Sequence, residues 1–163
     1  MRIGVISDTH DKVEQTRPAI DVFAAEGVER IIHCGDIGSR FVVELFDRWE
    51  THFVFGNTDY EQRALRECME LVGHVCHGRY GEVTWADRRI AFLHGDDFRQ
   101  WQQTIASGKF DLVCSGHTHQ KSVETIGSTV VLNPGAIERV AVPSVAIVDL
   151  SAMTVRHIDV VTR

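Results

Sequence analysis

The sequence predicts a layered α/β domain whose first half contains parallel strands. Over residues 1–70, short apolar runs alternate with stretches of helical periodicity in the order β-α-β-α-β. After that point the alternation stops, and short β-rich runs separated by turn residues follow. The length of 163 residues is enough for one sizeable hydrophobic core. We therefore expect a single domain over residues 1–163.

Composition narrows the class of protein. Hydrophobic residues make up 44% of the chain and charged residues 25%, as in ordinary soluble globular proteins. The formal net charge of −6 argues against stable nucleic-acid binding, because such binding needs a basic surface. No apolar run reaches membrane-spanning length, and the N-terminus does not resemble a signal peptide. The four cysteines form no C-x-x-C pair, so we expect a reduced, cytoplasmic protein without membrane association.

Three strands are expected in the first half, because three short runs are rich in apolar and β-branched residues: 2–6, 30–33 and 52–55. A polar loop follows each of them. In α/β proteins, loops at the carboxyl ends of strands hold ligands. Candidate ligands in these loops are Asp8 and His10, then Asp36, then Asn57. The pair Asp8 and His10, taken alone, is as typical of a turn or a helix cap as of a metal site.

Three helices are expected between and after these strands, near residues 18–25, 40–49 and 61–69. Pro18 suits the first turn of the first helix, and Gly27 suits its end. The second helix carries an apolar stripe that is typical of a core-facing surface. Asp59 and Gln62 fit a capping box at the third helix, so Asp59 is interpreted as structural. Asn57 has no such local role.

The second half begins with an expected hairpin over residues 81–93, with Asp87-Arg88 as its turn, and it leads into His94-Gly95-Asp96. A helix over 98–105 and a strand over 111–114 follow. That strand leads into Gly116-His117-Thr118-His119, which places two imidazoles one residue apart. Four further strands are interpreted as a second antiparallel sheet or a long β-meander: 122–126, 129–132, 145–150 and 154–160.

Seven side chains able to bind a metal ion therefore follow five expected strands: Asp8, His10, Asp36, Asn57, His94, His117 and His119. Turn chemistry accounts for aspartate and asparagine at strand ends, but not for four histidines. One ion takes about four to six ligands, so seven ligands fit two ions that share a carboxylate. Two divalent ions with two carboxylates and one hydroxide keep a small positive charge, which would attract a phosphodiester monoanion.

The order Asp-x-His, Gly-Asp, Gly-Asn, His-Gly and Gly-His-x-His resembles that of the calcineurin-like metallophosphoesterase superfamily. The short chain and its Asn133-Pro134-Gly135 loop resemble the small YfcE-type phosphodiesterases, which are related to the retromer subunit Vps29. The resemblance extends over nearly the whole chain. It implies a four-layer α-β-β-α sandwich, with two mixed sheets flanked by helices and the site at the strand ends.

The resemblance also implies a role for each ligand. The first metal would bind Asp8, His10, Asp36 and His119. The second would bind Asp36, Asn57, His94 and His117, with Asp36 bridging the two ions. A metal-bridging hydroxide would attack phosphorus in line with the leaving group, with Asp36, Asn57 and His117 as catalytic residues. Mixed nitrogen and oxygen ligands suit manganese, the metal we expect, and also iron, zinc, nickel or cobalt.

One position departs from the family pattern. Many members have a histidine after the asparagine of the third motif, and that histidine is thought to protonate the leaving group. This chain has Thr58, and a hydroxyl is a poor acid. General-acid help is worth about 10²–10⁴-fold, so diesters with good leaving groups should be better substrates than alkyl monoesters.

The sequence therefore predicts a metal-dependent phosphodiesterase that hydrolyses a small phosphodiester, for example a nucleotide. Relatives of this size suggest a dimer or a tetramer. The alternative is a Vps29-like protein-binding scaffold with weak or no catalysis.

Several other polar residues are assigned simpler roles. The remaining histidines are expected to be structural, although His33 lies close enough to Asp36 in sequence to support a ligand. Arg40, Asp96 and Asp97 flank the motifs and could contact the substrate. Cys34 and Cys114 are expected to be small core residues.

Overall fold

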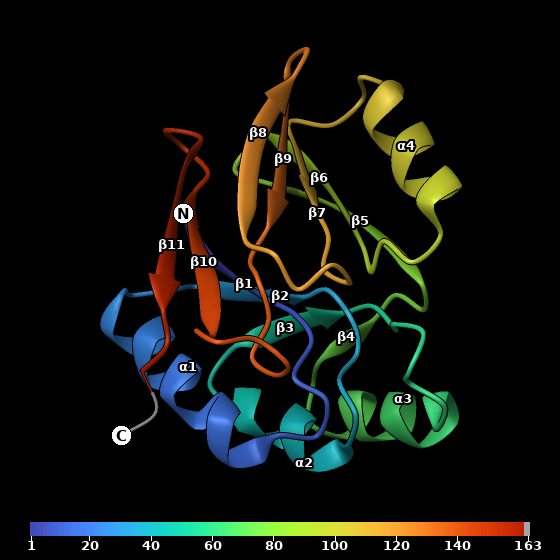
Figure 1. Ribbon diagram of the computed structural model, residues 1–163, viewed down its shortest axis with the longest axis vertical. Coiled ribbons are helices and arrows are strands. Elements are labelled where there is room, and N and C mark those ends of the chain that lie inside the picture. Colours follow the sequence, from blue (N-terminus) through green and yellow to red (C-terminus); the bar gives the residue numbers. More distant parts are fainter. Residues whose placement is uncertain (162–163) are drawn as a thin grey trace.

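The structure is a computed structural model that describes residues 1–161. Two β-sheets stack face to face, and helices cover the outer face of each, so the layers run α-β-β-α (Figure 1). The expected fold class, an α/β sandwich of two mixed sheets flanked by helices, is confirmed. No helix within the described residues is long and apolar enough to cross a membrane.

The first sheet has six strands in the order β11-β10-β1-β2-β3-β4. The neighbouring strands β1 to β4 are parallel, whereas β10 is antiparallel to β1 and β11 is antiparallel to β10. The strand bounds are Arg2–Ile6 (β1), Arg30–His33 (β2), Glu50–Phe53 (β3), Val75–Cys76 (β4), Ser144–Asp149 (β10) and Thr154–Asp159 (β11).

The second sheet has five strands in the order β5-β6-β7-β9-β8. Its three central strands, β6, β7 and β9, are parallel, and a hairpin partner lies antiparallel at each edge. The strand bounds are Tyr80–Trp85 (β5), Arg88–Leu93 (β6), Leu112–Cys114 (β7), Ser122–Ile126 (β8) and Thr129–Asn133 (β9).

The helices are divided unequally between the two outer faces. Three lie against the first sheet: α1 (Val13–Ala25), α2 (Arg40–Val43), which continues as the 3₁₀ turn η1 (Glu44–Phe46), and α3 (Gln62–Leu71). Only α4 (Phe98–Ala106) lies against the second sheet (Figure 1). The Asp97 side chain caps α4 by accepting the N–H of Gln100 at 3.0 Å.

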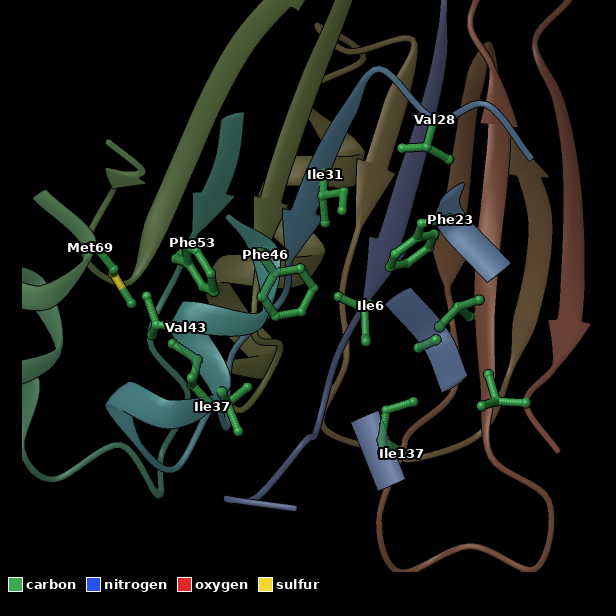
Figure 2. Close-up of a cluster of buried hydrophobic side chains, with 14 of the residues drawn as sticks. Ile6, Phe23, Val28, Ile31, Ile37, Val43, Phe46, Phe53, Met69 and Ile137 are labelled. Atoms are coloured by element: carbon green, nitrogen blue, oxygen red, sulfur yellow. The ribbon is translucent and has the colours of Figure 1, made fainter. Parts of the chain in front are cut away.

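Three apolar clusters fill the spaces between the layers. Figure 2 shows the cluster between the first sheet and its helices, where Ile6, Phe23, Phe46 and Phe53 are fully buried. A second cluster lies between the two sheets, and a third lies beneath α4. These clusters hold the strands rigidly, and the loops at the strand ends are anchored as a result.

The last two strands, β10 and β11, do not join the second sheet. The interpretation of the last four strands as one antiparallel sheet or meander is therefore wrong. Only β8 and β9 belong to that sheet, while β10 and β11 return to the first one. The reason lies in β10, where Val145, Ala146, Ile147 and Val148 are all buried. A strand with consecutive buried residues is covered on both faces of its sheet, as an interior strand is. Strand β10 has such a position, between β1 and β11.

Three other boundaries differ from expectation. Helix α1 begins at Val13, so Pro18 lies inside the helix rather than in its first turn. The second helix and its 3₁₀ turn end at Phe46 rather than at Trp49, and the Trp49 indole N–H donates to the Val28 carbonyl at 2.8 Å. The hairpin turn is Ala86-Asp87, not Asp87-Arg88, and both of its residues have positive φ, as a two-residue type I′ turn requires.

A hydrogen-bonded histidine pair lies beside the second apolar cluster. The Glu50 carboxylate accepts from His52 Nε2–H at 3.0 Å, so His52 Nδ1 is left to accept from His77 Nε2–H at 2.8 Å. The His77 ring lies edge-on to Phe92, with 4.9 Å between centroids. Burial lowers the pKa of His77 from 6.5 to about 4. Both rings are therefore neutral at pH 7.

We expect this pair to make stability depend on pH. Between pH 6.5 and about 4 the unfolded chain binds a proton at His77 that the native chain excludes, so the free energy of unfolding falls as pH falls. The His77 contribution lost by pH 5 is about 1 to 2 kcal/mol. Urea unfolding of wild type and His77→Gln at pH 5 and pH 7 tests this. An equal loss of stability in both proteins would contradict it.

Candidate metal centre

The loops that carry the predicted ligands meet where the carboxyl ends of the two sheets come together. Backbone hydrogen bonds join them: Asp8 N–H donates to the Gly35 carbonyl at 3.0 Å, and His10 N–H donates to the Asp36 carbonyl at 2.9 Å. A bond between the sheets runs from the His117 N–H to Asp8 Oδ2 at 3.1 Å. Parallel strands within each sheet place their carboxyl ends at one edge, which is why these distant motifs converge.

Five of the seven predicted ligands form a compact cluster. Asp8 Oδ1 lies 3.1 Å from His119 Nε2, 3.9 Å from His10 Nε2 and 4.0 Å from His94 Nε2. Asp36 Oδ2 lies 3.4 Å from His94 Nε2 and 3.6 Å from His10 Nε2. These contacts define two groups that could each hold a metal ion: Asp8, His10 and His119, and Asp8, Asp36 and His94.

Two atoms at the centre of this cluster lack a hydrogen bond within residues 1–161. They are Asp8 Oδ1 and His94 Nε2, and both are buried. An unpaired buried carboxylate oxygen is costly, and a cation in contact with it would remove that cost. The donors that surround the point are carboxylate oxygens and imidazole nitrogens, which suit a divalent transition metal. The residues present therefore fit a metal ion.

His94 and Asp36 are held in orientations that suit metal binding. His94 Nδ1–H donates to the Cys34 carbonyl at 2.8 Å, so the Nε2 lone pair points into the cluster. Burial lowers the pKa of His94, but Asp36 and Asp8 together raise it above its usual value. Burial would raise the pKa of Asp36, but the neighbouring His94 imidazole and the hydrogen bond from the Thr58 backbone N–H hold it well below the ordinary range. Asp36 is therefore ionised.

The backbone at the cluster is strained. Asp8, His10, Asp36, His117 and His119 all have φ between 44° and 67°, in the left-handed region that side chains other than glycine rarely occupy. Each such residue costs on the order of 1 kcal/mol or more, and this strain is typical of functional sites. The backbone conformation that brings these side chains together therefore lowers local stability.

Two glycines allow the loops to pack this closely. A Cβ added at Gly56 would lie 2.0 Å from Asp36 Oδ1 and 2.4 Å from the Asp36 backbone nitrogen. A Cβ added at Gly116 would lie 1.9 Å from Ser7 Oγ. Only glycine fits at either position.

His33 makes hydrogen bonds to the two loops that carry Asp8 and Asp36, in agreement with the supporting role that the sequence suggested. Its Nδ1 accepts the Gly35 N–H at 3.2 Å, so its Nε2–H donates to Thr9 Oγ1 at 3.0 Å. The Thr9 hydroxyl in turn donates to the Ile37 carbonyl at 3.0 Å. Burial lowers the pKa of His33 to about 3, which keeps the ring neutral. This chain of bonds fixes the Asp8 loop against the Asp36 loop.

Asp59 does not cap the third helix, so the capping-box interpretation is wrong. Its Oδ1 accepts the N–H groups of Ile37 and Gly38 at 2.8 and 3.0 Å, and its Oδ2 accepts the Gly56 N–H at 2.8 Å. Glu61 occupies the cap of α3 instead. The three backbone donors lie on two different loops, and their convergence on one carboxylate cannot be read from local spacing. Asp59 is structural, but it fixes the ligand loops rather than a helix end.

Asn57 and His117 lie at the exposed rim of the cluster and outside both three-residue groups. The His117 ring is edge-on to His94, with 5.1 Å between centroids. Asn57 directly precedes Thr58, whose N–H donates to Asp36 Oδ1 at 2.9 Å. Both residues are therefore next to the cluster, and their role as ligands stays a prediction.

Sequence reasoning missed Arg79 at this site. Its guanidinium donates to the Gly56 carbonyl at 3.2 Å and pairs with Asp96, so it joins the loops of the third and fourth motifs. Arg79 lies outside every motif, and no sequence signal marks it. Asp96 was a candidate for substrate contact, and the structure instead places it against this arginine.

A comparison with protein families gives the family of the chain. Residues 1–153 match the model of the calcineurin-like phosphoesterase superfamily domain. The chain belongs to this superfamily. The expected resemblance is confirmed, and so is the expected class of enzyme, a hydrolase of phosphoric esters. Superfamily members of this kind use divalent metal ions, in agreement with the two groups described above.

Individual phosphoesterases resemble the chain over nearly its whole length. "Phosphodiesterase MJ0936" of Methanocaldococcus jannaschii is 32% identical over 163 residues, which cover 97% of this chain and 98% of that protein. The solved structure of an archaeal phosphodiesterase, also 32% identical, superimposes with a TM-score of 0.91 over 98% of this chain and 99% of that one.

Two more distant structures share the fold. The YfcE phosphoesterase of E. coli is 18% identical, with a TM-score of 0.69 over 99% of this chain and 100% of that one. Vps29 of Entamoeba histolytica is 17% identical, with a TM-score of 0.68 over 98% of this chain and 99% of that one. The expected similarity to small phosphoesterases of the YfcE and Vps29 type is confirmed at the level of the fold.

Proposed function

We propose that this phosphoesterase is a phosphodiesterase that hydrolyses a small phosphodiester with two divalent metal ions. The observation that carries the proposal is the pair of three-residue groups that share the buried Asp8, whose Oδ1 accepts no hydrogen bond from any described residue. The 32% identical relative named as a phosphodiesterase supports the choice of a diester.

Two ions rather than one account for the number of donors. Asp8, His10 and His119 would hold one ion, and Asp36 and His94 would hold the other. Asn57 and His117 lie at the rim and would complete the second ion's ligands. The sequence suggested Asp36 as the bridging carboxylate. Asp8 belongs to both groups, and Asp36 Oδ2 lies within 3.6 Å of a histidine from each, so both carboxylates would serve as metal ligands.

The chemistry divides between the ions and the chain. Two divalent cations would activate a water nucleophile and balance the charge on the phosphoryl oxygens. Asp8 and the ionised Asp36 supply negative charge, while the Cys34 carbonyl keeps His94 Nε2 directed at the centre. Thr58 positions Asp36 through its backbone N–H and offers only a hydroxyl as an acid. Leaving groups that depart without a proton are therefore favoured.

Hydrolysis of bis-(p-nitrophenyl) phosphate and p-nitrophenyl phosphate by chelator-treated protein tests the proposal. We expect no activity without metal, recovery with added manganese, and faster cleavage of the diester. A preference for the monoester would contradict the assignment as a diesterase. Failure with manganese, iron, zinc, nickel and cobalt alike would favour the protein-binding scaffold. The single domain over residues 1–163, the dimer or tetramer and the cytoplasmic location stay predictions.

A further inference from the structure

A cavity of about 220 Å³ opens beside the metal centre, between α4 and the β8–β9 hairpin. Phe98 and Trp101 form its wall on α4, and Glu124 and Val131 form the opposite wall. Gly95 and Gly116 also line the cavity. None of the seven predicted ligands lines this cavity, and the mechanism proposed above does not use it.

The cavity adjoins the metal centre. Three of its lining residues neighbour predicted ligands in sequence: Gly95 directly follows His94, Gly116 directly precedes His117, and Thr118 lies between His117 and His119. A Cβ added at Gly116 would lie 2.6 Å from Asp8 Oδ2, so the Gly116 backbone forms a thin wall between the cavity and the Asp8 carboxylate. His117 and Thr118 are exposed, so a group attached to a phosphorus at the metal centre can extend past them into the cavity.

The wall on α4 presents a flat aromatic surface. The rings of Phe98 and Trp101 are stacked, with 5.7 Å between centroids and 17° between planes. The Trp101 indole N–H donates to Ser115 Oγ at 3.1 Å, which fixes the stack against the loop of the fifth motif. Phe98 is nonetheless 61% exposed. A large aromatic side chain held rigid but uncovered suits stacking with a planar ligand.

The polar group of the cavity limits what that ligand can be. Glu124, on the edge strand β8, is exposed and makes no ion pair within residues 1–161. A carboxylate accepts hydrogen bonds from amino and hydroxyl groups and repels a second phosphate. The volume is below the roughly 300–1,000 Å³ of sites for drug-sized ligands, so the cavity fits one compact substituent that contains a planar ring, rather than a longer chain.

We propose that this cavity binds the nucleoside of the phosphodiester substrate, with the base stacked on Phe98 and Glu124 accepting a hydrogen bond from an amino or hydroxyl group. The inference rests on the proposed function, because the phosphorus must lie at the metal centre. It adds a substrate class, a nucleoside phosphodiester, and the residues that select it.

The test compares two diesters with the same leaving group, adenosine 5′-(p-nitrophenyl) phosphate and methyl p-nitrophenyl phosphate, in manganese-loaded protein. Wild type should prefer the nucleoside diester in kcat/KM by about 5- to 100-fold, since base stacking is worth about 1–3 kcal/mol. Phe98→Ala should reduce this ratio at least about fivefold, mainly through KM. Phe41→Ala is the matched control, because Phe41 is also exposed but lies on α2.

If Phe98→Ala hydrolysed both diesters with the kcat/KM of wild type, the inference would be overturned and the proposed function would stay intact. Equal losses for both diesters would also overturn it, because they would place the leaving group at Phe98. Calorimetric titration with adenosine 5′-monophosphate gives an answer that does not depend on hydrolysis. Saturable binding that weakens in Phe98→Ala but not in Phe41→Ala supports the nucleoside site. Wild-type protein that binds no nucleotide rules the site out, even if diesters are cleaved.

Discussion

Replacing Asp36 with asparagine is expected to abolish metal-dependent hydrolysis. The variant Asp36→Asn keeps the size of the side chain and the oxygen that accepts the Thr58 N–H, so the loop should fold normally. It removes the negative charge that lies 3.4 Å from His94 Nε2 and 3.6 Å from His10 Nε2. If a metal ion contributes several kcal/mol of transition-state stabilisation, its loss reduces kcat/KM by about 10³-fold or more.

Diester hydrolysis and bound metal, measured by elemental analysis after gel filtration, check this expectation together. We expect Asp36→Asn to retain less metal than wild type at equal protein concentration. Asp21→Asn is the control, because it removes the same charge from the exposed face of α1. An Asp36→Asn variant with full metal content and activity would exclude Asp36 as a ligand.

A single methyl group at Gly56 should be nearly as damaging. In Gly56→Ala the new Cβ would lie 2.4 Å from the backbone nitrogen of Asp36 and 2.0 Å from its Oδ1. Backbone cannot move aside as a flexible side chain would, so the Asp36 loop must shift. Overpacking of this kind costs about 1–3 kcal/mol of stability, and a displaced ligand costs activity in addition. We expect a lower melting temperature and at least about a 10²-fold loss in kcat/KM.

Gly127→Ala separates this effect from a general intolerance of alanine. Gly127 lies in the β8–β9 turn with a φ of +62°, in the left-handed region, and no atom of another described part of the chain lies within 4 Å of an added Cβ. It should lose about 1 kcal/mol through backbone strain alone and keep its activity. If Gly56→Ala were as active as Gly127→Ala, the close approach at Gly56 would have no functional importance.

The sequence alone was sufficient for the candidate ligands and the family. Asp8, His10, Asp36, His94 and His119 each follow a strand whose apolar pattern is clear, and the structure brings these five together. Strand period and residue type are local properties, so they can be read from neighbouring positions. The α/β class followed from the same patterns, and the four-layer arrangement followed from the resemblance to the superfamily.

Only the tertiary structure decided which distant groups meet. The three hydrogen bonds to Asp59, the return of β10 to the first sheet and the position of Arg79 all depend on how loops and strands pack across the two sheets. The cavity at Phe98 likewise depends on tertiary packing, because its lining residues come from α4, β8 and β9. A sequence pattern records what each residue can contact, whereas burial and strand order determine which contact it makes.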